Sequence, residues 1–385
     1  MANTFTDLVS DIYVAADIVA RELVGFIPAV TINRGSEVAA FGDTVRAAYT
    51  RQPTLNTAYN PSMTIPEGDD QVVDNKTMTI SQVANVKMHY NGEEVRSLDN
   101  GVGFQSIYGD QITQAMRTVT NAIEAHVATV VYQGASRATG AAGTTPFGSN
   151  FDTVAEARQI LVDNGTPTDG QISMVMNTLA STKLRNLAQL QKANEAGGDS
   201  LLRQGVLLDL QGVAMRESAE VQSHVKGTAV SSLVNGALAV GATAIVFDTA
   251  TAGATGFKAG DVITFAADTV NKYVVETGLV GTSGTITIAG PGLRVAIPDN
   301  NAITVGATYT GNSVFHRQAV ELVSRAPQEP PFGDAATFTQ VIQDPLSGLS
   351  YRVSVYQGYG KNMIDVSTYY QAKVWKPDFV ATLLG

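Results

Sequence analysis

Hydrophobic residues recur every three or four positions between Ser106 and Tyr132, which is the longest helical pattern in the chain. This spacing places apolar side chains on one face of an α-helix. At 1.5 Å per residue, about 27 residues would span roughly 40 Å, longer than a small domain needs. We therefore predict a helix that braces other elements. Its apolar stripe consists of Ile112, Met116, Val119, Ile123, Val127 and Val130.

The ends and the polar faces of this helix follow from single residues. Ser106 is the predicted cap at its start, and Gly134 is the predicted stop. Arg117, Asn121 and Glu124 fall mostly on faces away from the apolar stripe. We therefore expect these three side chains to point away from the main packing surface of the helix.

A second amphipathic helix is predicted over residues 4–24, and Gly25 would end it. Because it has no core of its own, it packs either on the body of the protein or on a partner, and we favour the body. Its apolar stripe consists of Phe5, Leu8, Ile12, Ala15, Val19 and Leu23.

Two strand patterns flank a long polar segment. Residues 43–49 are predicted as a strand, and strand-like alternation resumes over residues 76–90. The segment between them is too polar to bury and too long for a common loop. We predict a projecting, hairpin-like arm that a neighbouring subunit receives; the alternative is a disordered surface loop. Its candidate inter-subunit residues are Arg51, Glu67, Asp69, Asp70 and Lys76.

Residues 151–222 show mixed helical and strand patterns. A helix is predicted over 151–163 with Asp152 or Thr153 as its cap, followed by a buried strand at 172–177 and a strand at 213–221. Between these strands a helix is predicted over 178–196. Its main apolar positions are Leu179, Leu184, Leu187 and Leu190.

From about residue 224 to 314 helical periodicity disappears, and Gly, Thr, Ala and Val dominate. Short strands separated by Gly-rich turns predict a small β-barrel or sandwich of about domain size. An insertion between two strands of another domain is tolerated when the strand ends lie close together. The predicted strands are 244–248, 261–266, 272–277 and 284–290.

The C-terminal part of the chain is again rich in strand patterns. Residues 337–358 predict a hairpin, with its turn at 344–348. The pattern over 367–375 predicts the last strand, which stops at Pro377. The fold class is therefore α+β, with an all-β insertion and with late strands that complete the first unit.

Composition narrows the function further. The chain has 385 residues, no cysteine and a net charge of −10, and 44% of its residues are hydrophobic. The negative charge disfavours a dedicated nucleic-acid-binding protein but is compatible with a container for a polyanion. No apolar run is long enough to span a membrane, and the N-terminal residues do not resemble a signal peptide, so we expect a cytosolic origin.

No marked catalytic, metal or cofactor motif is found. The four histidines, His89, His126, His224 and His316, are at least 35 residues apart, so there is no local ligand pair. There is no G-x-S-x-G elbow and no phosphate-binding loop, and Gly101-Val102-Gly103 lacks the rest of a dinucleotide fingerprint. We expect a structural role for His126, no enzyme activity and no cofactor.

The order of these elements resembles the HK97-type fold of tailed-phage major capsid proteins. The all-β insertion narrows the resemblance to the P22-like coat protein family, which carries a β-barrel insertion domain at this place. The chain is shorter than that family implies, so the insertion is expected to lack some loops. The segments that carry the resemblance are 258–266, 314–324 and 348–360.

The resemblance implies a domain division and a role for each part. Residues 106–132 would be a spine helix, about 45–80 an extended arm, and 213–222 and 315–385 largely peripheral and axial regions. The implied division is 1–30 for an N-terminal arm or helix, 43–90 for the extended arm and flanking strands, 91–222 for the spine helix and α/β core, 223–314 for the insertion domain, and 315–385 for the remaining core strands.

The function that the resemblance implies is a major capsid protein of a tailed double-stranded DNA phage. Copies would form hexamers and pentamers of an icosahedral shell in the virion, after synthesis in the host cytoplasm. The implied partners are other copies, a scaffolding protein, a portal and a decoration protein, with DNA enclosed without sequence-specific binding and without a membrane. The alternatives are a β-rich surface or carbohydrate-binding protein and an enzyme with an unmarked triad.

Overall fold

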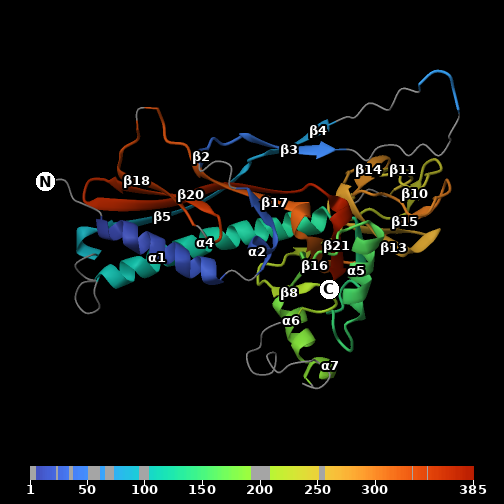
Figure 1. Ribbon diagram of the computed structural model, residues 1–385, viewed down its shortest axis with the longest axis horizontal. Coiled ribbons are helices and arrows are strands. Elements are labelled where there is room, and N and C mark those ends of the chain that lie inside the picture. The colour runs from blue at the N-terminus through green and yellow to red at the C-terminus, as the bar shows by residue number, and fades with distance from the viewer. Residues whose placement is uncertain are drawn as a thin grey trace.

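The computed structural model describes residues 6–22, 25–33, 38–50, 61–65, 73–94, 104–191, 209–250, 256–331, 333–344 and 346–385. One long helix, α4, lies lengthwise through the molecule (Figure 1). A mixed, largely antiparallel sheet and a shorter helix lie beside one half of α4, and a β-barrel and a small α/β layer lie at its other end (Figure 1).

The helix α4 spans Phe104–Gln133, which confirms the long helix predicted over 106–132. Ile112, Met116, Val119, Ile123 and Val127 are all buried, as the stripe predicts. The helix ends before Gly134, but it starts two residues before Ser106, so Ser106 does not cap it and that prediction is wrong.

The helix α1 (Thr6–Glu22) packs along α4, so the predicted packing on the body is confirmed. Its buried face includes Ala15 and Val19. On the exposed side, the Arg117 guanidinium binds both Glu22 carboxylate oxygens at 2.6 and 2.7 Å. A one-turn helix, α2 (Phe26–Ala29), follows, and its Phe26 ring stacks on the ring of Phe315 at 6.1 Å.

The larger sheet of the core packs on α4 through its central strand, β20. The predicted hairpin is confirmed as β18 and β19, and the Gly348 amide closes its turn onto the Asp344 carbonyl at 2.8 Å. The strands are β1 (Thr31–Asn33), β2 (Val38–Ala39), β5 (Gln82–Asn91), β17 (Val320–Pro327), β18 (Ala336–Gln343), β19 (Ser350–Gln357) and β20 (Lys361–Val374).

Two strands outside this sheet form the base of the predicted arm. β3 (Thr44–Thr50) and β4 (Val73–Thr79) pair as an antiparallel ladder (Figure 1). The alternation over 76–90 covers two strands, because the chain leaves β4 at Ile80 and joins β20 as β5. Residues 61–65 are exposed, including the apolar side chains of Met63 and Ile65.

A second group of strands continues the core near the C-terminal end of α4. It includes β21, which follows β20, so residues 367–375 are not the last strand as predicted. The strands are β6 (Arg137–Gly140), β7 (Ile172–Met176), β8 (Ala214–Glu217), β9 (Ser223–His224), β16 (Tyr309–His316) and β21 (Val380–Leu384). The short 3₁₀ turns Arg317–Ala319 (η1) and Pro377–Phe379 (η2) flank β16 and β21.

Three helices accompany these strands, and two local predictions about them are wrong. In α5 (Asp152–Asp163) the cap position is Phe151 and no side chain caps the helix, because Asp152 already lies in its first turn. The helix predicted over 178–196 is broken after Arg185 into α6 (Thr178–Arg185) and α7 (Ala188–Gln191). Leu179 is exposed, because the buried face runs through Ala180 and Leu184 instead.

The insertion contains a closed six-stranded antiparallel barrel, in which each strand pairs with two neighbours in the order β12–β15–β10–β11–β14–β13 and back to β12. Its interior has a hydrophobic cluster of its own, which includes Phe247, Phe265 and Tyr273. All four predicted strands are confirmed. The six strands are β10 (Ser232–Val234), β11 (Ala244–Asp248), β12 (Val262–Phe265), β13 (Asp268–Thr277), β14 (Gly284–Ile288) and β15 (Ala302–Val305).

Candidate functional site at the junction of barrel and core

Most of the predicted inter-subunit residues lie outside the described part of the chain. Arg51, Glu67, Asp69 and Asp70 lie outside the described residues. Lys76, on β4, donates from Nζ to the Trp375 carbonyl at 2.7 Å, and burial lowers the pKa of its ammonium group. Lys76 therefore helps to hold the hairpin against the end of β20.

The four histidines lie on four different elements of the fold, as their spacing in the sequence suggests. Within the described ranges no three histidine, aspartate or glutamate side chains are grouped so that they could hold a metal ion. His126 lies on α4, half-buried, with its ring edge-on to that of Tyr370 at 5.5 Å. Burial lowers the pKa of His126, and this packing fits the predicted structural role.

The two chain connections to the barrel lie side by side. β9 leads into the insertion and β16 leads out of it, and the two pair through Tyr309 with His224 and Thr310 with Ser223. This pairing is the close approach of strand ends that tolerance of an insertion requires. Because β16 begins at Tyr309, the last residues before 314 belong to a strand of the core sheet.

A buried polar cluster joins these connections to the barrel and to the end of α4. The Asp261 carboxylate is fully buried and lies 2.8 Å from His224 Nε2. It also accepts hydrogen bonds from the Gly227 and Lys258 amides, each at 2.8 Å. A buried carboxylate needs such partners, because an uncompensated one is expensive to remove from water.

Aromatic rings close this cluster. The Tyr309 hydroxyl donates to the Gly260 carbonyl at 2.6 Å, and the Tyr132 ring lies edge-on to His224 at 5.7 Å. Gly260 has φ +91°, and a Cβ there would lie 2.8 Å from Tyr132. Only glycine therefore suits this position, both for its backbone conformation and for its space.

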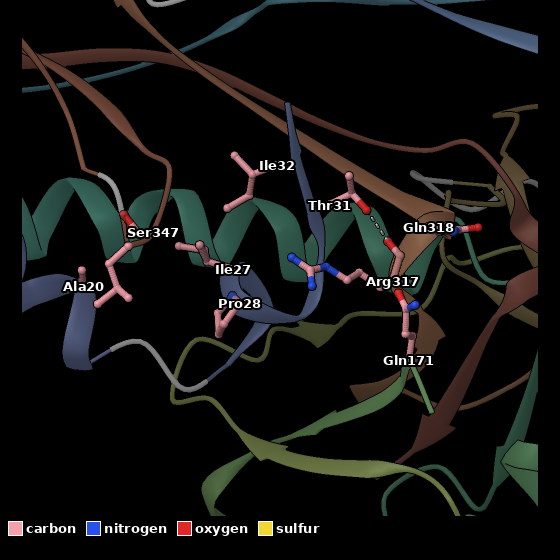
Figure 2. Close-up of a pocket in the computed structure, with 10 residues that line it drawn as sticks. Ala20, Ile27, Pro28, Thr31, Ile32, Gln171, Arg317, Gln318 and Ser347 are labelled. Atoms are coloured by element: carbon pink, nitrogen blue, oxygen red, sulfur yellow. Dashed lines mark hydrogen bonds between the residues drawn. The ribbon is translucent and has the colours of Figure 1, made fainter. Parts of the chain in front are cut away.

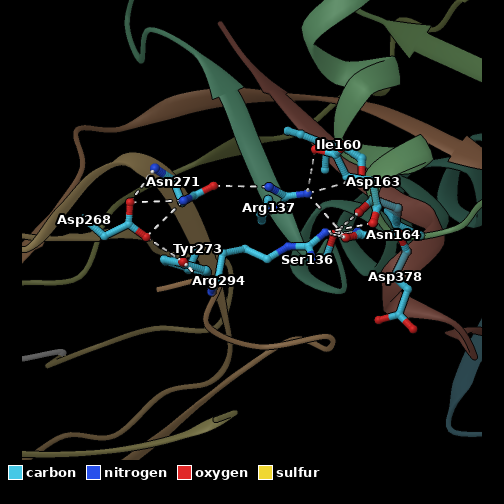
Figure 3. Close-up of polar contacts among 11 residues, drawn as sticks. Ser136, Arg137, Ile160, Asp163, Asn164, Asp268, Asn271, Tyr273, Arg294 and Asp378 are labelled. Atoms are coloured by element: carbon cyan, nitrogen blue, oxygen red, sulfur yellow. Dashed lines mark hydrogen bonds and ion pairs between the residues drawn. The ribbon is translucent and has the colours of Figure 1, made fainter. Parts of the chain in front are cut away.

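A second polar network joins the barrel to the core on the other side. β13 pairs with β6 over only two residue pairs, Lys272 with Ala138 and Tyr273 with Arg137. Figure 3 shows the Arg137 side chain between the barrel and the C-terminal end of α5. Its guanidinium donates to Asn271 Oδ1 at 3.1 Å and to Asn164 Oδ1 at 3.3 Å.

A second arginine reaches the same end of α5 from the barrel. Arg294 donates to Asn164 Oδ1 at 2.7 Å and to the Asp163 carbonyl at 3.0 Å (Figure 3). Burial, and then the charge of Arg294, lowers the pKa of Arg137, and the Asp163 carboxylate at 3.8 Å opposes this shift. Two arginines thus share one amide oxygen, which fixes the barrel against α5.

The Asn164 side chain completes this network on the core side. Its amide nitrogen donates to the Asp378 carbonyl at 2.8 Å and to Ser136 Oγ at 3.1 Å. On the barrel side, the Tyr273 hydroxyl donates to Asp268 Oδ2 at 2.7 Å and accepts from the Arg294 amide at 2.9 Å. Burial raises the pKa of Tyr273, so its hydroxyl remains a donor.

One pocket borders this junction, and another lies beside the N-terminal segment. One of about 600 Å³ lies between α5 and β13, with Arg137, Asp163 and Lys272 in its lining. Another of about 790 Å³ lies between α1, α2 and η1, with Ile27, Pro28 and Arg317 in its lining. Figure 2 shows Arg317 extending toward α2, while its carbonyl accepts a hydrogen bond from Thr31 Oγ1 at 2.9 Å.

The junction joins the barrel to the core through hydrogen bonds. Its principal residues, Arg137, Asn164 and Arg294, were not singled out from the sequence. The partners of Arg294 are 130 and 131 residues away, so no local spacing marks them. The sequence marked this junction only by the change in composition and periodicity at the boundaries of the insertion.

Comparisons with known proteins bear on the fold. No protein-family model and no curated protein sequence matches the chain. None of the helices in the described part of the chain is long and apolar enough to cross a membrane. Among solved structures, matches include the capsid of the cyanophage P-SCSP1u, with 12% identity, coverage of 94% of this chain and 88% of that chain, and a TM-score of 0.50.

Two further matches are looser. A structure from Mycobacterium phage Che8 has 15% identity, covers 89% of this chain and 84% of that chain, and has a TM-score of 0.49. A virus-like particle from Pyrococcus furiosus has 8% identity, covers 97% of this chain and 98% of that chain, and has a TM-score of 0.45. We argue only from the cyanophage structure, and at its identity the likeness concerns the fold. The chain therefore shares the mixed α and β fold of this capsid structure, and its structural neighbours have HK97-type folds.

Proposed function

We propose that the chain is the major capsid, or coat, protein of a tailed double-stranded DNA phage. Copies form the hexamers and pentamers of an icosahedral shell that encloses the genome. The observation that carries this proposal is the likeness to the cyanophage capsid structure over 94% of this chain. The role of the chain is packing between subunits and not catalysis, so it needs no cofactor.

The β3–β4 hairpin and the segment beyond it form the arm that lies over a neighbouring subunit. Met63 and Ile65 support this role, because two fully exposed apolar side chains in one short segment gain stability when a partner covers them. Arg51, Glu67, Asp69, Asp70 and Lys76 belong to this arm and make its polar inter-subunit contacts.

The barrel is the insertion domain of a P22-like coat protein and acts as a folding and stability module. Its closed ring of strands and its own hydrophobic cluster support this assignment. The division of the chain follows the resemblance: 1–30, 43–90, 91–222, 223–314 and 315–385. Contact between capsomers is a second role of the barrel.

The partners of the proposed shell follow from its construction. A scaffolding protein controls curvature during assembly in the host cytoplasm, a portal occupies one vertex, and a decoration protein binds the finished virion. The net charge of −10 limits adhesion of the shell wall to packaged DNA, because phosphate contacts dominate non-specific DNA affinity.

Electron microscopy of the protein, purified alone and co-expressed with a candidate scaffold, tests this function. We expect closed shells or hexameric and pentameric capsomers. A species that stays monomeric under every condition would contradict the proposal. Size-exclusion chromatography of the same samples measures the assembled fraction.

Deletion of residues 52–72 tests the arm. We expect a folded subunit that does not assemble, and normal shells from this variant would refute the role of the arm. A finer test replaces Met63 and Ile65 by serine, which should reduce the assembled fraction. The matched control is Leu179→Ser, at an exposed apolar residue of α6 outside the arm and the barrel, which should assemble normally.

A further inference from the structure

The side chain of Glu124 is buried in the middle of α4, although the helical pattern places it on a polar face. Its residue exposure is 6%, and its carboxylate accepts three hydrogen bonds. The Phe26 amide donates to Oε1 at 2.5 Å, the Ile27 amide donates to Oε2 at 2.9 Å, and Ser218 Oγ donates to Oε1 at 3.0 Å. We call these four residues with Gly25 the Glu124 cluster.

On one side, the Glu124 cluster contacts the N-terminal segment 25–33. Gly25 has no room for a side chain, because a Cβ would lie 2.0 Å from Glu124 Oε1 and 2.7 Å from Ser218 Cβ. Phe26 and Ile27 are completely buried. The chain then continues into β1, which pairs with β17 from Thr31 to Asn33. The hydrogen bonds from the Phe26 and Ile27 amides to Glu124 therefore fix the start of this segment, and with it the position of the segment.

On its other side, the Glu124 cluster contacts the part of the chain that leads to the barrel. Ser218 follows β8, and its amide continues the sheet by donating to the Met176 carbonyl at 3.0 Å. From Ser218 the chain passes through Gln222, whose carbonyl accepts from the Gly311 amide at 3.1 Å, into β9 and the insertion. One carboxylate on the spine helix thus contacts both the N-terminal segment and the strand exit toward the barrel.

Electrostatics explains why both contacts depend on the same group. Burial raises the pKa of Glu124, the hydrogen bonds from Phe26, Ile27 and Ser218 lower it, and the charge of Glu220 raises it. No lysine or arginine in the described ranges is hydrogen-bonded to the carboxylate. A buried carboxylate without a cation relies on its donors, so the loss of one donor weakens the site for the others.

We propose that Glu124 is a positioning residue that couples the N-terminal segment 25–33 to the segment 218–224, so that displacing either one loosens the other. The coupling passes through one carboxylate and not through contact between long surfaces. This inference concerns the single subunit and does not rest on the capsid role.

Amide hydrogen exchange on the full-length protein tests this coupling, because it reports local opening at each segment. Ile27→Ala truncates a completely buried side chain of the N-terminal segment and leaves Gly25, Glu124 and Ser218 unchanged. We expect exchange to accelerate roughly tenfold or more at residues 26 and 27 and also within 218–224, on the far side of the carboxylate. Acceleration confined to residues 25–33 would overturn the proposal.

Ser218→Ala provides the reciprocal test and should still fold, since it removes one hydroxyl and adds no bulk. It should accelerate exchange at the Phe26 and Ile27 amides, and the double variant with Glu124→Gln should show non-additive effects on those amides. Additive effects, or unchanged exchange at both amides in Ser218→Ala, would overturn the proposal.

The matched control is Glu22→Gln. It removes a carboxylate that also joins the N-terminal helix to α4, through Arg117, but at an exposed position. It should leave exchange in 218–224 unchanged. An effect there as large as that of Ile27→Ala would mean that any loosening of the N-terminal region reaches the barrel connection, and the specific role of Glu124 would be lost.

Discussion

The region around the spine helix and the barrel are stabilised in different ways. Around α4, residues from the N-terminal helix, the larger sheet and β16 share one hydrophobic cluster, so distant parts of the chain depend on each other. The barrel has a separate cluster drawn entirely from residues 229–303. Between the two regions lie hydrogen bonds and ion pairs, at Asp261 and at Asn164, and an apolar contact in which Val262 and Val274 of the barrel join the cluster around α4.

This difference teaches that the barrel has a core of its own, and that polar contacts, together with Val262 and Val274, fix its orientation on the spine region. Apolar contacts reward burial without direction, whereas hydrogen bonds require defined geometry. A polar junction therefore suits a domain whose orientation matters more than the area it buries. Four predictions test this contrast between the spine region and the barrel.

The largest effect is expected from removing the barrel. Residues 225–308 can be replaced by an Asn-Gly turn, because His224 and Tyr309 face each other as an antiparallel pair. We expect a marked loss of soluble yield and of melting temperature, since the cluster around Asp261 is lost with the barrel. The isolated segment 225–308 should still unfold cooperatively. An unchanged melting temperature in the shortened chain would contradict a stabilising role.

Cavities in the two hydrophobic clusters should separate the regions. Ile123→Ala in α4 and Phe247→Ala in the barrel are each expected to cost about 2–5 kcal/mol in local stability. Hydrogen exchange should show that Ile123→Ala weakens the core elements together. Phe247→Ala should weaken the barrel strands and leave α4 protected. Equal loss of protection in α4 from both variants would show that the regions form one cooperative unit.

A smaller effect is expected at the polar junction. Arg294→Met removes hydrogen bonds to Asn164 and to the Asp163 carbonyl, and should cost about 1–3 kcal/mol while leaving the barrel itself folded. Denaturant unfolding measures the cost, and small-angle scattering measures the change in barrel orientation. The control is Lys226→Met, at an exposed lysine of the insertion. Similar losses from both substitutions would argue against a specific junction.

The smallest effect concerns pH. Burial lowers the pKa of His126 from its ordinary value of 6.5, so the unfolded chain binds a proton more readily than the folded one. Stability from this group is therefore complete above that value and is lost as the pH falls through it toward the folded pKa. His126→Phe keeps the ring beside Tyr370 and should flatten this part of the pH profile. An unchanged pH profile in His126→Phe would contradict this prediction.

Local patterns predicted much of the fold. The stripe from Ile112 to Val127 predicted the buried face of α4, and the turn-rich pattern after residue 224 predicted four of the six barrel strands but missed β10 and β15. The errors share one cause. Ser106, Asp152 and Leu179 were each assigned from local preference, but neighbouring turns and packing shifted the helix ends or faces by one or two residues.

The candidate site was less predictable than the fold. Glu124 lies off the apolar stripe, and only the arrival of residues 25–27 on that face of α4 buries it. Nothing in the local sequence distinguishes Arg137 and Arg294 from surface arginines. Their role arises because the C-terminal end of α5 lies between them in the folded chain. Likewise, one alternating pattern over 76–90 served two strands in different sheets, because alternation does not encode the partner of a strand.

The sequence by itself determined the order and type of the main elements, the place of the inserted β unit and the apolar face of the spine helix. These features follow from the repeat of the backbone, 3.6 residues in a helix and two in a strand, which neighbouring residues express directly. Only the tertiary structure decided that the barrel closes, that β9 and β16 meet, and that Glu124 is buried between the N-terminal segment and the barrel connection. Those contacts join residues about a hundred positions apart, and their energy exists only once the chain has brought them together.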